Sequence, residues 1–262
     1  MMPRPKPGLI DAHAHLCDPA FDKDRTEVLE RACRAGVAAV IAVAENILDA
    51  RKNLELAAKY PMLKPAAGLY PAQLDLNLAV EMADLIRQNH SILNAIGEVG
   101  LDYWVVKEDS EKELQREIFK IFIELSRELN LPLNVHSRSA GRHAIQFLIE
   151  NNAVRVQMHA FDGKASAALP AVEAGYFFSI PPSVVRSRQK QKLVRQLPLS
   201  CLLVETDSPV LGPTPDERNE PANIRQSVKA IAMLKDIPEE TVIAAVWENT
   251  ERLYGALFSN SK

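Results

Sequence analysis

Cysteine and long apolar runs are both scarce in this sequence of 262 residues. It has three cysteines (Cys17, Cys33 and Cys201) and no Cys-x-x-Cys pair, so we expect reduced thiols and no disulfide or zinc–thiolate framework. No segment approaches the roughly 18 uninterrupted apolar residues of a transmembrane helix. The start, "MMPRPKPGLI", lacks the apolar core of a secretory signal. These absences predict a cytoplasmic or nuclear protein without membrane association.

An excess of basic residues is also missing. The formal net charge is −3, whereas proteins that grip long nucleic acids by their surface usually carry a basic excess. An anionic substrate would therefore be held by local features, and bound metal ions can supply positive charge themselves. If the substrate is a nucleic acid, we expect short contacts near a strand end and a low sensitivity to salt.

Short apolar or β-branched runs alternate with segments of helical spacing along the chain. The runs are 9–13, 37–44, 63–69, 93–98, 133–136, 155–160, 176–180 and 201–207. Such alternation predicts a parallel sheet, and eight units in about 250 residues are typical of a (β/α)8 TIM barrel. We therefore predict a single barrel domain over 1–262. The alternative is an open doubly wound sheet, whose nucleotide-binding version loses its main support because Gly-x-Gly-x-x-Gly is absent.

The clearest helical segment is 110–130, where apolar residues recur at steps of three and four. Ser110 followed by Glu113 predicts a capping box at its start. The last segment, 223–258, is predicted to form terminal helices that cover the barrel, and Pro238 marks a helix start within it.

Metal-competent side chains stand at the carboxyl ends of five predicted strands. They are His13, His15, Glu98, His136, His159 and Asp207. Residues two apart in a strand share a face, so His13 and His15 point to one place. In a barrel the carboxyl ends of the strands form the face on which active sites are built. We therefore expect all six side chains to converge there.

Imidazole and carboxylate without thiolate suit Zn²⁺, Mn²⁺, Fe²⁺ or Co²⁺, and Mg²⁺ if most imidazoles are spared. Six ligands are too many for one catalytic ion that keeps an open position, so a pair of ions uses them better. Glu98 is the candidate bridge because it lies between the ligands of the first and fifth strands. Such a pair lowers the pKa of a bound water and stabilises the attacking and leaving oxygens. Asp207 can ligate one ion and act as general base.

Six stretches of the sequence resemble motifs of the TatD family of metal-dependent deoxyribonucleases, which belongs to the amidohydrolase-like barrel enzymes. The matching motifs are "IDAHAHL", "AIGEVGLDY", "PLNVHSRSAGR", "MHAFDG", "LLVETDSP" and "NEPANI". Several stretches, among them "HAFDG" and "GYFFSIPPS", are most similar to the branch of the third animal TatD-domain paralogue.

The resemblance implies exonucleolytic hydrolysis of DNA, single-stranded or at ends, with two divalent ions (Mg²⁺, Mn²⁺ or Zn²⁺). It implies His13, His15, Glu98 and Asp207 around one ion, and Glu98, His136 and His159 around the other. No protein partner is indicated by the sequence.

One motif departs from the family. Where the family commonly has Gly-x-His-Pro, this chain has Gly68-Leu69-Tyr70-Pro71. Tyr70 can hydrogen-bond a phosphate oxygen but cannot replace the charge of a protonated histidine. Arg138 is a second candidate for substrate binding, because its guanidinium can hold a phosphate bidentately. Backbone N–H groups of 139–141 would add to that anion site if they open a helix.

Two further carboxylates are expected to face the barrel interior. Asp11 shares the parity of His13 and His15, and can either orient one of them or bond the interior. Glu205, two residues before Asp207, points inward by the same parity and needs a partner there.

The ligand set leaves two other functions open. A metal-dependent deacylase or amidohydrolase would use the same two ions on an ester or amide. A non-catalytic metal-binding protein is the third reading, for which Tyr70 is the only hint in the sequence.

Overall fold

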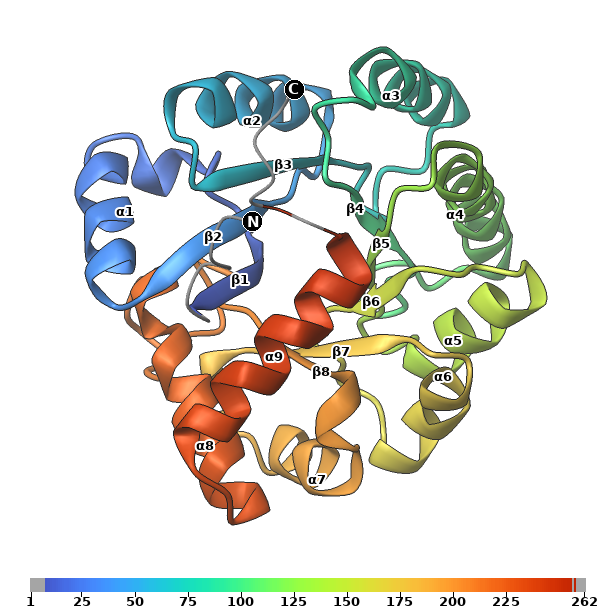
Figure 1. Cartoon of the computed structure of the whole chain (residues 1–262). Helices are drawn as coiled ribbons and strands as arrows, with labels where there is room; N and C mark the ends of the chain where they lie inside the picture. The colour runs from blue at the N-terminus through green and yellow to red at the C-terminus, as the bar shows by residue number, and fades with distance from the viewer. Residues whose placement is uncertain (1–7, 256, 258–262) are drawn as a thin grey trace, which may run out of the picture.

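Eight parallel strands form a closed barrel in the computed structural model, which describes residues 8–255 and 257 (Figure 1). The strands are β1 (Leu9–Ala14), β2 (Val37–Ala42), β3 (Leu63–Ala67), β4 (Ala95–Gly100), β5 (Leu133–His136), β6 (Val156–Met158), β7 (Phe177–Ile180) and β8 (Leu202–Val204). They pair in sequence order from β1 to β8. Two backbone hydrogen bonds of 2.8 Å close the ring, from Asp207 N–H to the His13 carbonyl and from His15 N–H to the Ser208 carbonyl. The predicted barrel is confirmed, and the open doubly wound sheet is excluded.

Helices surround the barrel (Figure 1). The α-helices are α1 (Arg25–Arg34), α2 (Ile47–Lys59), α3 (Leu76–Asn89), α4 (Asp109–Leu129), α5 (Gly141–Glu150), α6 (Leu169–Glu173), α7 (Arg188–Gln196), α8 (Ile224–Lys235) and α9 (Glu239–Tyr254). Short 3-10 helices lie at Pro19–Phe21, Ala165–Ala168, Pro182–Val185, Leu199–Cys201 and Pro221–Asn223. Within the described part of the chain, no helix is both long enough and apolar enough to cross a bilayer.

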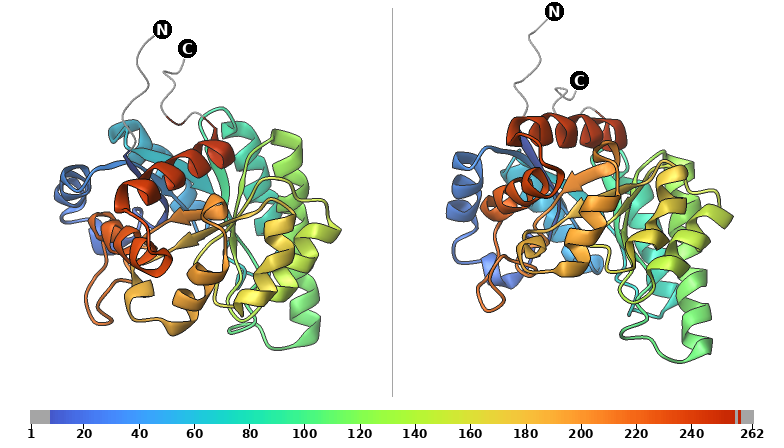
Figure 2. Two further views of the ribbon diagram at one scale, coloured as in Figure 1. Left: turned by 60° about the horizontal axis from the view of Figure 1, so that its bottom comes forward. Right: turned by 90° about the horizontal axis from the view of Figure 1, so that it is seen from below.

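Helix α9 lies across the end of the barrel where the strands begin (Figures 1 and 2). Alternate residues of the strands point inward, and Ile10, Ile41 and Leu203 belong to a buried cluster that also contains Trp247 and Tyr254 of α9. The other face of the strands packs against the surrounding helices in a larger core. Because α9 fills the amino end, an open site can form only at the carboxyl ends of the strands.

The predicted capping box on α4 is wrong. The helix begins at Asp109, so Ser110 lies inside its first turn, and the N-cap residue Glu108 makes no side-chain capping hydrogen bond. Glu113 pairs with Arg116 one turn further on. A charged partner on the exposed helix surface thus competes successfully for the carboxylate that a capping box would need.

The predicted terminal helices are confirmed. They are α8 and α9, and Pro238 is the N-cap of α9, with φ at −61°, the value that the proline ring imposes. Phe258, the predicted end of this segment, lies outside the described residues.

Candidate metal centre

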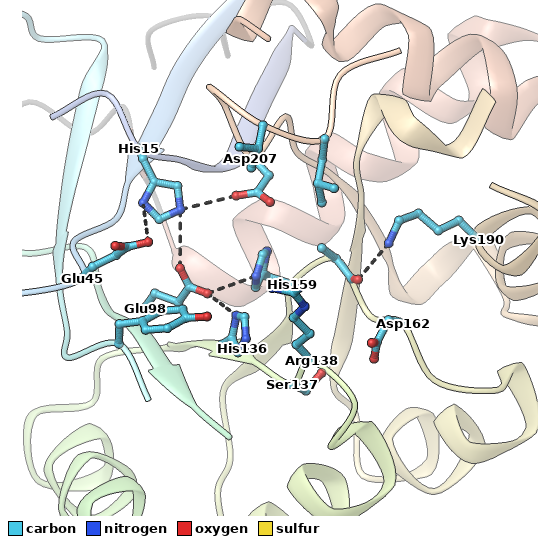
Figure 3. A pocket seen from close by; sticks show the side chains of 14 residues that line it. His15, Glu45, Glu98, His136, Ser137, Arg138, His159, Asp162, Lys190 and Asp207 are labelled. Atoms are coloured by element: carbon cyan, nitrogen blue, oxygen red, sulfur yellow. Dashed lines mark hydrogen bonds and ion pairs between the residues drawn. The ribbon is translucent and has the colours of Figure 1, made fainter. Parts of the chain in front are cut away.

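All six predicted ligands meet at the carboxyl end of the barrel, and Figure 3 shows five of them, all except His13. Five of them line a cavity of about 450 Å³, and His13 lies fully buried beside them. Glu98, His136, His159 and Asp207 are each between 2% and 8% exposed. The convergence follows from the register, because parallel strands of a barrel end at one rim.

Four ligand atoms form a compact first cluster. His13 Nε2 lies 3.1 Å from His15 Nε2 and 3.3 Å from Asp207 Oδ1. His15 Nε2 lies 3.4 Å from both Asp207 Oδ1 and Glu98 Oε2, and His13 Nε2 lies 3.7 Å from Glu98 Oε2. Four tetrahedral nitrogen and oxygen ligands of Zn²⁺ stand about 3.3–3.6 Å apart. The spacing of these four atoms therefore fits a small divalent cation at their centre.

The other carboxylate oxygen of Glu98 faces a second cluster. Its Oε1 atom lies 2.5 Å from His136 Nδ1 and 3.2 Å from His159 Nε2. The rings of His13 and His159 stack with centroids 3.9 Å apart, so the two clusters adjoin. Glu98 thus presents one oxygen to each cluster, which is the arrangement that a bridging carboxylate requires.

The second ring nitrogen of two histidines is held by a buried acceptor. His13 Nδ1–H donates to Asn134 Oδ1 at 2.8 Å, and His136 Nε2–H donates to Asp102 Oδ2 at 2.9 Å. Such partners fix the tautomer and orientation of metal-binding histidines. His159 Nδ1 is buried without a hydrogen-bond partner in the described structure. The donor set and its orientation therefore fit a pair of divalent ions.

Sequence reasoning missed both acceptors and three charged residues of the pocket, Glu45, Asp162 and Lys190. Asn134 carried a signal, because it stands two residues before His136 and so shares its face of β5. Asp102 accepts the backbone N–H groups of Trp104 and Val105 at 2.8 and 3.0 Å, an Asx-turn that could have been found as a turn. Lys190 of α7 also lines the pocket, but no pattern in the sequence of this helix predicts that position.

Tyr70 and Arg138 both line the pocket, as the prediction of substrate contacts requires. The Tyr70 hydroxyl donates to Asp102 Oδ2 at 2.7 Å, so its proton is already engaged. Arg138 is exposed, and its guanidinium carbon lies 5.1 Å from the centroid of the Trp104 ring.

The expected anion site at 139–141 is wrong at its first two positions, and at the second the Ala140 N–H group donates to the Ser137 carbonyl at 2.9 Å. The Ser139 N–H group donates to Asp162 Oδ2 at 2.9 Å. Helix α5 starts only at Gly141, with Ala140 as its N-cap. The Asp162 carboxylate therefore occupies the donor that was expected to face a phosphate.

Asp11 and Glu205 both point inward with partners. Asp11 accepts the Thr206 N–H and hydroxyl groups at 2.8 and 2.5 Å, so it joins β1 to the segment after β8 and touches no histidine ring. Glu205 accepts the Ala160 N–H at 2.7 Å and the Ser179 hydroxyl at 2.5 Å. Its Oε2 atom lies 3.7 Å from His159 Nδ1. Of the two alternatives for Asp11, interior bonding is the one observed.

The charges of the pocket favour a bound cation. Burial opposes ionisation of Glu98, but the charges of His159 and His136 outweigh it and hold its pKa well below the usual value. Burial likewise opposes ionisation of Asp207, and hydrogen bonds with His13 and His15 lower its pKa. Both carboxylates are therefore ionised at neutral pH, and their field attracts positive charge to the space between them.

Residues 10–255 match the model of a family described as TatD related DNase. The chain is 45% identical over 265 residues to the human "Deoxyribonuclease TATDN3", with 95% of this chain and 96% of the relative covered. It is 32% identical to the Bacillus subtilis "Uncharacterized metal-dependent hydrolase YabD", covering 94% of this chain and 98% of the relative. The solved structure of YJJV, a TatD homologue from Escherichia coli, superposes with a TM-score of 0.87 at 27% identity, covering 94% of this chain and 97% of that one.

Proposed function

The chain belongs to the family of TatD-related DNases, and on that premise we propose that it trims DNA from a strand end by metal-dependent phosphodiester hydrolysis. The observation that carries this proposal is the placement of Glu98, with Oε2 at the first cluster and Oε1 at the second. The elements of one barrel run from Leu9 to Tyr254, which supports a single hydrolase domain over 1–262.

We propose that each cluster holds one divalent ion, Zn²⁺, Mn²⁺ or Mg²⁺. The first would be held by His13, His15, Glu98 and Asp207, and the second by Glu98, His136 and His159. When bound, such a pair supplies Lewis acidity that lowers the pKa of a water and stabilises charge on the attacking and leaving oxygens. The protein's own part is to fix the ligands, through Asn134 behind His13 and Asp102 behind His136.

Asp207 is the proposed proton acceptor. Its carboxylate lines the pocket, and the lowered pKa keeps it in the ionised form that a proton acceptor needs. A general base must lie within hydrogen-bond reach of the proton that it takes. A water in the cavity that Asp207 lines would be within reach of its carboxylate.

Arg138 and Tyr70 are the proposed substrate contacts, and they should respond differently to substitution. Arg138→Gln is expected to raise KM for DNA about 10-fold or more, since a hydrogen bond to a charged group contributes about 1.5–3 kcal/mol.

Tyr70→Phe should lower kcat about 10-fold, because it removes the hydrogen bond to Asp102 and loosens His136. Steady-state kinetics separate the two effects, with Arg142→Gln, an exposed arginine near the start of α5, as the control. An unchanged KM in Arg138→Gln would remove Arg138 from the substrate site.

Product analysis tests the proposed function. A 5′-end-labelled single strand should be shortened progressively when divalent metal is present, and should stay intact after chelation. Acyl esters and amides assayed in parallel test the deacylase alternative. Turnover of an acyl substrate with intact DNA would replace the nuclease by the deacylase, and metal binding with no turnover of either would leave a non-catalytic metal-binding protein.

A further inference from the structure

Helix α7 and the residues just before it are unusually basic for this chain. Positions 186–196 contain five basic residues and no acidic one, whereas the whole chain has a net charge of −3. Arg188, Lys192 and Arg195 stand at steps of four and three, so they share one face of the helix. All three are exposed. The chain therefore concentrates positive charge on one helix face.

Together with Lys164 from the segment after β6, these three side chains line one surface groove, which we call the α7 groove. In the described part of the chain, none of its four cations forms an ion pair or a hydrogen bond with another residue. Four arginines elsewhere on the surface do form such pairs. The pairs are Arg31–Glu220, Arg87–Glu128, Arg116–Glu113 and Arg218–Asp24. A set of neighbouring cations without carboxylate partners is a surface suited to an external polyanion.

The α7 groove adjoins the metal centre. Asp162 and Lys190 line the pocket (Figure 3), and each stands close in sequence to a residue of the groove. Gln189 Nε2 donates to the Gly163 carbonyl at 2.6 Å, and Lys190 Nζ donates to the Ala160 carbonyl at 2.8 Å. These bonds tie the start of α7 to the segment after β6, so both walls of the groove are fixed at the pocket's edge.

Lys190 stands where the pocket and the groove meet. It is only 7% exposed, and within the described structure the Ala160 carbonyl is the one hydrogen-bond acceptor of its ammonium group. An ammonium group has three donors, so two remain for a ligand in the pocket. Burial lowers the pKa of Lys190, and the nearby carboxylates of Glu205, Asp162 and Asp207 oppose part of that shift.

We propose that the α7 groove binds the phosphate backbone of the DNA strand as it leaves the metal centre. Lys190 takes a phosphate at the pocket's edge, and Arg188, Lys192 and Arg195 take those that follow. This proposal rests on the proposed nuclease function and adds the path of the substrate. It also explains how an acidic protein can hold an anionic polymer: a few cations beside the site carry the contacts, and the remainder of the surface does not.

Binding of a fluorescein-labelled single strand, followed by anisotropy over a range of salt concentrations, tests the path. The measurement uses the full-length, metal-loaded Asp207→Asn protein, which is expected to bind DNA without cutting it. Arg188→Gln, Lys192→Gln and Arg195→Gln are introduced together, because glutamine keeps helix propensity. A matched control replaces Arg51, Arg127 and Lys229, exposed on three other helices, by glutamine.

The groove substitutions should weaken binding at low salt about 10- to 100-fold and reduce the slope of log K against log salt by about 2, since each phosphate contact on a single strand contributes about 0.7. The control should stay within about twofold. Equal losses in both triple variants, or none in either, would overturn the proposal. Thermal unfolding checks that the groove variant is folded. If it is not, Lys192→Gln alone must still lower the slope by about 0.7, and an unchanged slope overturns the proposal.

Cleavage by the wild-type protein is assayed separately. If the wild-type protein cleaves DNA but the groove substitutions leave DNA binding unchanged, the proposed strand path is wrong and the nuclease function stands. If the substitutions weaken binding but the wild-type protein does not cleave DNA, the nuclease function is wrong and the groove remains a nucleic-acid-binding surface.

Discussion

Glu98→Ala is expected to lower kcat/KM for DNA roughly a thousandfold or more, because metal ions contribute several kcal/mol of transition-state stabilisation and each 1.36 kcal/mol is tenfold in rate. It should also reduce bound metal from about two ions per chain to about one or fewer. The reason is geometric. Glu98 lies within 3.4 Å of His15 Nε2 through one oxygen and within 3.2 Å of His159 Nε2 through the other, so one substitution removes a ligand from both clusters. Metal analysis of the purified protein and steady-state digestion check the two effects together.

Two variants separate loss of the bridge from other damage. Glu98→Gln keeps the volume and one oxygen acceptor but removes the charge, so it should fall between wild type and Glu98→Ala in metal content. Glu45→Gln changes another carboxylate of the same pocket, which lies 3.9 Å from His15 Nδ1 and is 47% exposed. It should lose less than about tenfold, because an exposed charge is screened by solvent. Full metal content and near-wild-type turnover in Glu98→Ala would refute the bridge.

Asp207→Asn should lower kcat by about 10²–10⁴-fold, the range that a positioned general base contributes, while the protein unfolds at nearly the wild-type temperature. Asparagine suits this position for a backbone reason. Asp207 has φ at 55°, in the left-handed region that asparagine and aspartate tolerate better than other non-glycine residues. The substitution therefore removes charge and basicity and leaves the chain path unchanged. Pre-steady-state digestion and a thermal melt of the same preparation give both values.

Asp162→Asn is the matched control for Asp207→Asn. It removes the charge of another aspartate that lines the pocket, but its side chain accepts the Ser139 N–H group and contacts neither cluster. A loss of less than about tenfold is expected. If Asp207→Asn lost no more than this control, Asp207 would be neither a base nor an essential ligand.

The convergence of the six candidate ligands was predictable because their placement depends on local rules. His13 and His15 share a strand face by parity, and the carboxyl ends of parallel strands meet at one rim whatever the loops do. The position of Glu98 between the ligands of β1 and β5 follows from strand order alone. The alternation of strand and helix predicted the barrel for the same reason.

The pairing of side chains far apart in the sequence was not predictable. Asp102 reaches His136 across 34 positions of sequence, and Asn134 reaches His13 across 121. Neither separation is encoded in a local pattern. Ser139 was misjudged for the same reason, because its partner Asp162 arrives from the segment after a different strand. The basic residues of α7 were visible in the sequence, but their lack of carboxylate partners is a tertiary fact.

DNA hydrolysis by a centre that uses a pair of ions is the function proposed for this protein. The most direct measurement is digestion of an end-labelled single strand by wild-type protein that has been stripped of metal and then titrated with one divalent ion. We expect little cleavage without metal and a rate that rises until about two equivalents per chain are bound. Full activity with one equivalent of metal per chain would contradict the two-ion centre. Shortening of the strand at the same rate with and without metal would contradict metal-dependent hydrolysis.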